Sequence, residues 1–236
     1  MRRIDDDGCA YAGSQLQLQI YVNRRQDELS RVVINAIGSL PPDSQLVWKS
    51  PIEVEKFAEY QDLAFLRAIE LENLWQGLKG FWPRRGPVWD GLAVIVTPDR
   101  DSRPWGVVLV EAKSYPAEIY GRGCQASNKS RRAIESALKE TREWLGLPSR
   151  EQSWPFWVGP LYQTANRLAH LHFFRREGVH AWLLNVYFLN DPHSLTTLEE
   201  WRSALPCPKA QLGIKDMRLR CAVEVFLEAR ERSELC

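Results

Sequence analysis

Two acids and a lysine in the middle of the 236-residue chain have the types and spacing that could form a metal site. Asp90 stands at the start of one apolar run, and Glu111-Ala112-Lys113 ends the next. Carboxylate oxygens are the ligands that hard divalent cations take in proteins. If the fold brings Asp90 and Glu111 together, we expect them to hold Mg²⁺, with Mn²⁺ as a substitute, beside the Lys113 ammonium.

The segments that must position these residues are predicted to form a β-hairpin. Residues 89–96 and 105–113 are rich in β-branched and aliphatic side chains, and the polar segment 97–104 between them is bounded by proline. Both runs are otherwise almost wholly apolar, which is typical of strands in a sheet covered on both faces. Charged residues are rarely buried unless they are paired, so an acid and a lysine at the end of a buried strand indicate a specific role.

The pairing of the two strands decides whether the acids meet. A register that places Leu92 opposite Leu109 also places Asp90 opposite Glu111, and the alternation of side chains puts Lys113 on the same face. Opposed like charges destabilise a sheet, and a cation bound between the two carboxylates would relieve their repulsion. The ordinary alternative is an amphipathic hairpin whose charged ends face solvent.

This constellation resembles the signature of the PD-(D/E)xK nuclease superfamily, which has the restriction-endonuclease-like fold. Asp90 is followed after 20 residues by Glu111-Ala112-Lys113, although no proline directly precedes Asp90. The resemblance implies an α/β/α core with a mixed sheet, in which Asp90 and Glu111 hold Mg²⁺. It also implies that Lys113 positions or deprotonates the water that attacks a phosphodiester. The expected function is a Mg²⁺-dependent nuclease.

Five further residues are candidates for accessory roles. The resemblance suggests Gln125 as a polar residue after the second strand, near the metal, and Glu59 or Asp62 as a further acid upstream. In the segment 161–177, Asn166 and Arg167 fall on the more polar side of the expected helix. They could reach the scissile phosphate or line the metal site. For all five residues, ordinary polar surface is the alternative, and for Asn166 and Arg167 a solvated helix face is favoured.

Short basic clusters could contact nucleic acid. Arg84 and Arg85 directly precede the first strand, and Lys129, Arg131 and Arg132 follow the second. They could border one cleft and track a phosphate backbone, with DNA favoured over RNA. Such clusters are also common on any protein surface. The net charge of the whole chain is +1, so nucleic-acid binding would depend on a local patch.

Composition favours a cytoplasmic protein that does not enter a membrane. The five cysteines are scattered without a CxxC pair, which favours reduced thiols over a disulfide framework or structural zinc. The N-terminus has no apolar segment typical of a signal peptide, and no run approaches 18 apolar residues.

We expect a single α/β domain over residues 1–236. Its core would span about 50–190, with an N-terminal strand–helix extension over 1–48 and a C-terminal extension over 195–236. The predicted elements are an alternating strand over 15–22, helices over 27–37, 49–80, 128–145, 161–177 and 198–204, a strand over 180–189 and an undecided strand or helix over 219–228. The usual first core strand is not evident from the sequence.

Two other functions are compatible with the sequence. A non-catalytic binding or assembly protein could use the same fold and keep the acids as remnants. An enzyme acting on another substrate could use the aromatic residues near the predicted site, among them Trp89, Trp105 and Tyr115.

Overall fold

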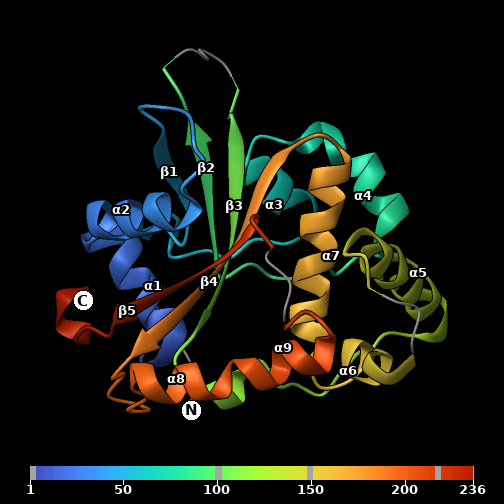
Figure 1. Ribbon diagram of the computed structural model, residues 1–236. Coiled ribbons are helices and arrows are strands. Elements are labelled where there is room, and N and C mark those ends of the chain that lie inside the picture. Colours follow the sequence, from blue (N-terminus) through green and yellow to red (C-terminus); the bar gives the residue numbers. More distant parts are fainter. Residues whose placement is uncertain (1–3, 99–102, 148–150, 216–218, 236) are drawn as a thin grey trace.

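The centre of the protein is one mixed β-sheet. The computed structural model describes residues 4–98, 103–147, 151–215 and 219–235. Within these residues five strands are hydrogen-bonded in the order β1-β2-β3-β4-β5 (Figure 1). β1, β2 and β3 pair antiparallel, whereas β3, β4 and β5 pair parallel. The strands are β1 (Gln45–Ser50), β2 (Gly91–Val96), β3 (Gly106–Lys113), β4 (His180–Leu189) and β5 (Ala222–Glu228).

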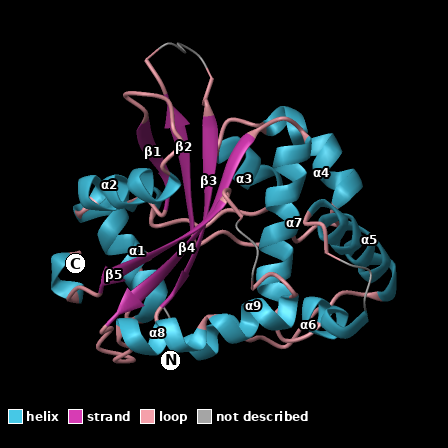
Figure 2. Cartoon of the chain, viewed as in Figure 1, coloured by secondary structure: helices cyan, strands magenta, loops and turns pink. Residues whose placement is uncertain are grey.

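Helices cover both faces of this sheet. Those described are α1 (Gly13–Arg24), α2 (Gln26–Ile37), α3 (Asp62–Ala68), α4 (Trp75–Phe81), α5 (Asn128–Trp144), α6 (Trp154–Val158), α7 (Tyr162–Arg176), α8 (Leu198–Ala204) and α9 (Pro206–Leu212). α1 and α2 pack on one face, and α3 to α9 contribute to the core on the other (Figure 2). The fold is therefore α/β with a mixed sheet, as expected, and the described residues form five strands of that sheet.

The predicted hairpin forms in the predicted register. Leu92 pairs with Leu109 and Val94 pairs with Val107 in the β2–β3 ladder. Alternate residues of both strands enter the two cores on opposite faces of the sheet, which explains why the strands are apolar throughout. The parallel pairing of β3 with β4 then places the end of β3 beside the middle of a buried strand.

The strand expected over residues 15–22 is wrong, because these residues lie in helix α1. Alternation of Gln and Leu fits a strand, but α1 is buried nearly all round, so its polar positions are buried too. Gln17 exchanges hydrogen bonds with the backbone of Arg230, and Gln19 bonds to the backbone of Gly8 and Ala10. Long amide side chains that bind backbone groups made a buried helix look half polar.

The single helix expected over 49–80 is also wrong. Its first residues end β1, which is the core strand that the sequence did not reveal, and the remainder forms α3 and α4 with a break between them. Glu70 at the break has a φ of 63°, in the left-handed region that ends a right-handed helix. The burial of β1 alternates, but its apolar residues Leu46, Val47 and Trp48 are consecutive in sequence, so the residue types do not show the alternation.

Most of the other predicted elements are present, whereas the short helices α6 and α9 were not predicted. The helices near 27–37, 128–145, 161–177 and 198–204 and the strand at 180–189 are confirmed, and residues 222–228 form a strand.

Cys9 is disulfide-bonded, so the expectation of reduced cysteines is wrong for that residue, whereas Cys124, Cys207 and Cys221 are free. Among the helices described, none has the length and hydropathy to cross a membrane.

Candidate functional site

Asp90, Glu111 and Lys113 meet on the face of the sheet that α7 covers. Asp90 immediately precedes β2, and its Oδ2 accepts a hydrogen bond from the backbone N–H of Ala112 at 2.8 Å. This bond fixes the Asp90 side chain across the end of β3. Because residues of β3 alternate between faces, Glu111 and Lys113 project to the same side as Leu109, toward α7. The hairpin thus brings the three residues together, as the sequence predicts.

The Glu111 carboxylate lies between two cations. Its Oε2 accepts a hydrogen bond from Nε of Arg167 at 2.5 Å, and its Oε1 accepts one from the Lys113 ammonium. The side chains of Glu111 and Arg167 are 7% and 4% exposed, so this pair is buried. Glu111 is therefore charge-balanced by α7 on one side and by its own strand on the other.

Arg167 is held by contacts on all sides, so the expected solvated helix face is wrong for this residue. Its Nη2 donates to the backbone oxygen of Val88 at 2.7 Å, and its Nη1 donates to Oδ1 of Asn166 at 3.1 Å. Its guanidinium carbon lies 4.7 Å from the ring centroid of Trp89, in cation–π geometry. Asn166 itself is 9% exposed and supports Arg167 through this hydrogen bond.

The two carboxyl groups have opposite pKa shifts. Burial, followed by the negative charge of Glu111, raises the pKa of Asp90 to about 7. Burial would also raise the pKa of Glu111, but the adjacent Arg167 and Lys113 cations lower it below its usual value. Burial opposes the charge of Lys113, yet Glu111 and Asp90 raise the pKa of its ammonium. Near neutral pH, Lys113 is thus protonated and Asp90 is the group poised to gain or lose a proton.

Of the two upstream acids, Glu59 is the one electrostatically coupled to the site. Glu59 is half-buried and accepts a hydrogen bond from Gln15 at 3.0 Å. Burial raises the pKa of Glu59, and the charge of Glu111 raises it further. Asp62 instead accepts hydrogen bonds from the backbone N–H groups of Arg85 and Gly86, each at 3.0 Å. Asp62 thus shapes the loop that leads to β2.

Gln125 is not part of the cluster around Glu111. Its side chain is exposed and donates to the backbone oxygen of Arg122 at 2.9 Å.

The basic residues proposed for nucleic-acid contact lie in two places. Arg84 and Arg85 are exposed in the loop before β2, and Lys129, Arg131 and Arg132 lie in the first turns of α5, where Arg131 pairs with Glu135 at 2.9 Å.

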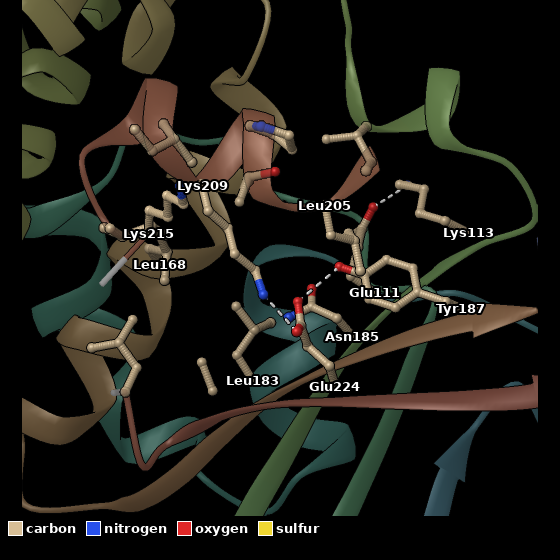
Figure 3. A pocket seen from close by; sticks show the side chains of 17 residues that line it. Glu111, Lys113, Leu168, Leu183, Asn185, Tyr187, Leu205, Lys209, Lys215 and Glu224 are labelled. Carbon is tan, nitrogen blue, oxygen red and sulfur yellow. Dashed lines mark hydrogen bonds and ion pairs between the residues drawn. The ribbon is translucent and has the colours of Figure 1, made fainter. Parts of the chain in front are cut away.

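Glu111 and Lys113 also line a cavity of about 290 Å³. The sheet forms its floor, and α7 and α9 contribute its walls. Figure 3 shows the ion pair of Lys113 with Glu111 at one side and a second pair, between Lys209 and Glu224, beyond Tyr187. Asn185, Glu224 and Lys209 also line this cavity and were not predicted as site residues. The polar Asn185 within the apolar strand 180–189 was a signal that could have indicated a site.

The donor set fits a divalent cation through Asp90 and Glu111. Mg²⁺ is commonly bound by one or two carboxylates together with water and substrate phosphates. Burial and then the charge of Glu111 raise the pKa of Asp90, and a cation bound beside it would favour its ionised form. Carboxylate oxygens have two lone pairs each, so Glu111 can accept its present hydrogen bonds and still offer a ligand. In the described part of the chain, no three His, Cys, Asp or Glu side chains are grouped as ligands of one ion.

Comparison of the chain with protein-family models, with curated proteins and with solved structures found no match.

Proposed function

We propose that the protein is a metal-dependent nuclease with a restriction-endonuclease-like core. The observation that supports this proposal most is the meeting of Asp90, Glu111 and Lys113 on a hairpin whose register the sequence predicted, with Glu111 and Lys113 lining a cavity. The sheet supports it further, because an antiparallel β1–β2–β3 unit followed by a parallel β4 is compatible with the mixed-sheet core implied by the resemblance. Asp90 and Glu111 would hold Mg²⁺.

Each residue of the site has a role that follows from its contacts. A divalent cation between Asp90 and Glu111 would supply Lewis-acid stabilisation of phosphoryl charge. Lys113, held as an ammonium beside Glu111, orients the attacking water and stabilises negative charge in the transition state. A protonated Lys113 cannot accept a proton, so its raised pKa supports positioning and argues against a role as general base. Arg167 acts as a positioning residue, because it fixes the carboxylate of Glu111.

The substrate proposed is nucleic acid, with DNA favoured over RNA. Arg84 and Arg85 in the loop before β2 are exposed and can contact a phosphate backbone close to Asp90 in sequence. Lys129 and Arg132 at the start of α5 are exposed as well. Mutation of a phosphate-contacting lysine or arginine is expected to weaken binding at all sequences and to lower its salt dependence.

Cleavage of labelled single- and double-stranded DNA and RNA with Mg²⁺ tests the proposal. We expect cleavage by the wild type that EDTA abolishes, and a loss of about 10²- to 10³-fold in Lys113→Met. Lys79→Met is the matched control, because Lys79 is exposed on α4. Activity equal in Lys113→Met and the wild type would contradict the proposed role of Lys113. No Mg²⁺-dependent cleavage of any substrate would contradict the nuclease.

One observation favours a second candidate, a binding or assembly protein that retains the acids without catalysis. Arg167 and Lys113 already occupy both oxygens of Glu111, which is an arrangement that a purely structural ion-pair network would also show. Under this alternative, divalent cations do not bind to Asp90 and Glu111.

A further inference from the structure

The cavity beside Glu111 and Lys113 is built differently on its two sides. Its floor carries a row of three polar residues, because Glu111 pairs with Asn185 and Asn185 pairs with Glu224 across adjacent parallel strands. The residues that α7 and α9 contribute are mainly apolar and include Leu168 and Leu212, with Lys209 of α9 as a charged exception. A ligand with one flat apolar face and a polar edge matches these two surfaces.

The polar residues on the floor are pre-positioned. Glu224 accepts a hydrogen bond from Nζ of Lys209 at 2.6 Å and one from the hydroxyl of Tyr187 at 3.3 Å (Figure 3). These contacts fix its carboxylate and leave lone pairs for a further donor. The Asn185 side chain can both donate and accept, and among the described residues no hydrogen bond engages it.

We infer that this cavity receives one unpaired nucleotide of the substrate strand. Its base would lie against the wall formed by Leu168 and Leu212, and the edge of the base would face Asn185 and Glu224. The phosphate of that nucleotide would then lie at Glu111 and Lys113. This inference rests on the proposed nuclease function and deepens it by naming the form of substrate that the site accepts.

Size and position support a single nucleotide. A volume of about 290 Å³ stands at the lower end of the range for small-molecule pockets, so it suits one nucleotide and excludes a base pair. A base inside a duplex can enter such a pocket only after it leaves the stack, which costs a few kcal/mol, whereas a base in a single strand or an unpaired end is already free. Single strands, overhangs and mismatches are therefore the expected substrates.

Titration calorimetry of the metal-free protein in EDTA tests the inference apart from activity. The probes are the four nucleoside 5′-monophosphates, with ribose 5-phosphate as the probe that lacks a base. We expect at least one nucleotide to bind with a Kd below about 1 mM, and ribose 5-phosphate to bind at least about tenfold more weakly. Failure of all four nucleotides to bind, or equal binding of ribose 5-phosphate, overturns the inference.

Two substitutions place the binding in the cavity. Ala222→Trp fills the cavity from the edge strand β5, and Ala133→Trp makes the same change at an exposed position of α5, outside the cavity. We expect Ala222→Trp to lose nucleotide binding and Ala133→Trp to retain it. Asn185→Leu, which keeps the branched shape of the side chain but removes its hydrogen-bonding groups, is the second variant. It decides the result if circular dichroism shows that Ala222→Trp does not fold. Binding that is unchanged in the folded variants overturns the inference.

The outcomes separate the inference from the proposed function. If Mg²⁺-dependent cleavage occurs and no nucleotide binds in the cavity, the nuclease stands and the inference fails. If nucleotides bind in the cavity but no nucleic acid is cleaved under any condition, the nuclease fails and the inferred role of the cavity in substrate selection fails with it.

Discussion

Arg167 and Glu111 form a buried ion pair, with 2.5 Å between Nε and Oε2, that joins the central helix α7 to the strand β3. The pair positions the Glu111 carboxylate, because Arg167 is itself fixed by Val88, Asn166 and the ring of Trp89. It also lowers the pKa of Glu111 against the effect of burial. The ion pair thus keeps one carboxylate of the candidate site ionised, while its neighbour Asp90 has a pKa near neutrality.

Removal of Arg167 is expected to destabilise the fold. In Arg167→Ala, the buried Glu111 loses one of its two cations, and breaking such a buried pair costs about 3–5 kcal/mol of unfolding free energy. Urea denaturation measures this loss. Arg131→Ala, which breaks an ion pair exposed on α5, is the control and should cost less than about 1 kcal/mol. A loss below about 1 kcal/mol in Arg167→Ala would show that the pair does not support the fold.

The raised pKa of Asp90 predicts that stability falls as pH rises. Its pKa is about 7 in the folded protein, whereas an ordinary Asp titrates near 3.8. Between these values the folded state binds more protons than the unfolded state. The contribution of Asp90 to the free energy of unfolding is therefore fully favourable below about pH 4 and is lost as pH rises through 7.

Asp90→Asn removes the carboxylate whose ionisation lowers the stability of the folded protein at high pH. At pH 8 without divalent cations, we expect Asp90→Asn to unfold with about 1–3 kcal/mol more free energy than the wild type, with little difference near pH 4. Asp43→Asn is the control, because Asp43 is exposed and its positive φ suits asparagine. Denaturation curves at both pH values measure the difference. If Asp90→Asn is no more stable than the wild type at pH 8, burial and the charge of Glu111 do not raise the pKa of Asp90 in the folded protein.

The hairpin and the central residues of the site were predictable from sequence because both depend on neighbouring strands. Apolar runs with a short polar connection fix the β2–β3 register, and that register alone brings Asp90 to Glu111. The positions of Arg167 and Glu59 depend on how α7 and the loop before α3 pack against the sheet. Periodicity cannot predict such packing, so Arg167 was expected to face solvent.

Two element errors have a related cause. α1 satisfies buried glutamines through backbone groups from distant segments, a relationship that alternation of Gln and Leu cannot reveal. β1 is identified only by its pairing with β2. Likewise, the row formed by Glu111, Asn185 and Glu224 exists because three strands pair in parallel. The sequence of a single strand does not predict which strands lie beside it.

Glu59 is expected to contribute to metal affinity through its charge. It is electrostatically coupled to Glu111, so Glu59→Gln should weaken Mn²⁺ binding by about threefold to tenfold, which corresponds to about 0.7–1.4 kcal/mol. Asp62→Asn is the matched control, since Asp62 binds the backbone of the Arg85 loop. Calorimetry compares the two variants. A larger effect from Asp62→Asn than from Glu59→Gln would reverse the assignment of the upstream acid.

Binding of Mn²⁺ by calorimetry, on the wild type beside Asp90→Asn and Glu111→Gln, tests the central claim most directly. Both substitutions preserve side-chain shape and remove one negative charge. Glu55→Gln, an exposed acid in the short helix Glu53–Glu55, is the control. The proposal predicts binding by the wild type and by Glu55→Gln, and a loss of at least about tenfold in both site variants. A wild type that does not bind Mn²⁺, or site variants that bind it equally well, would contradict a metal-dependent nuclease.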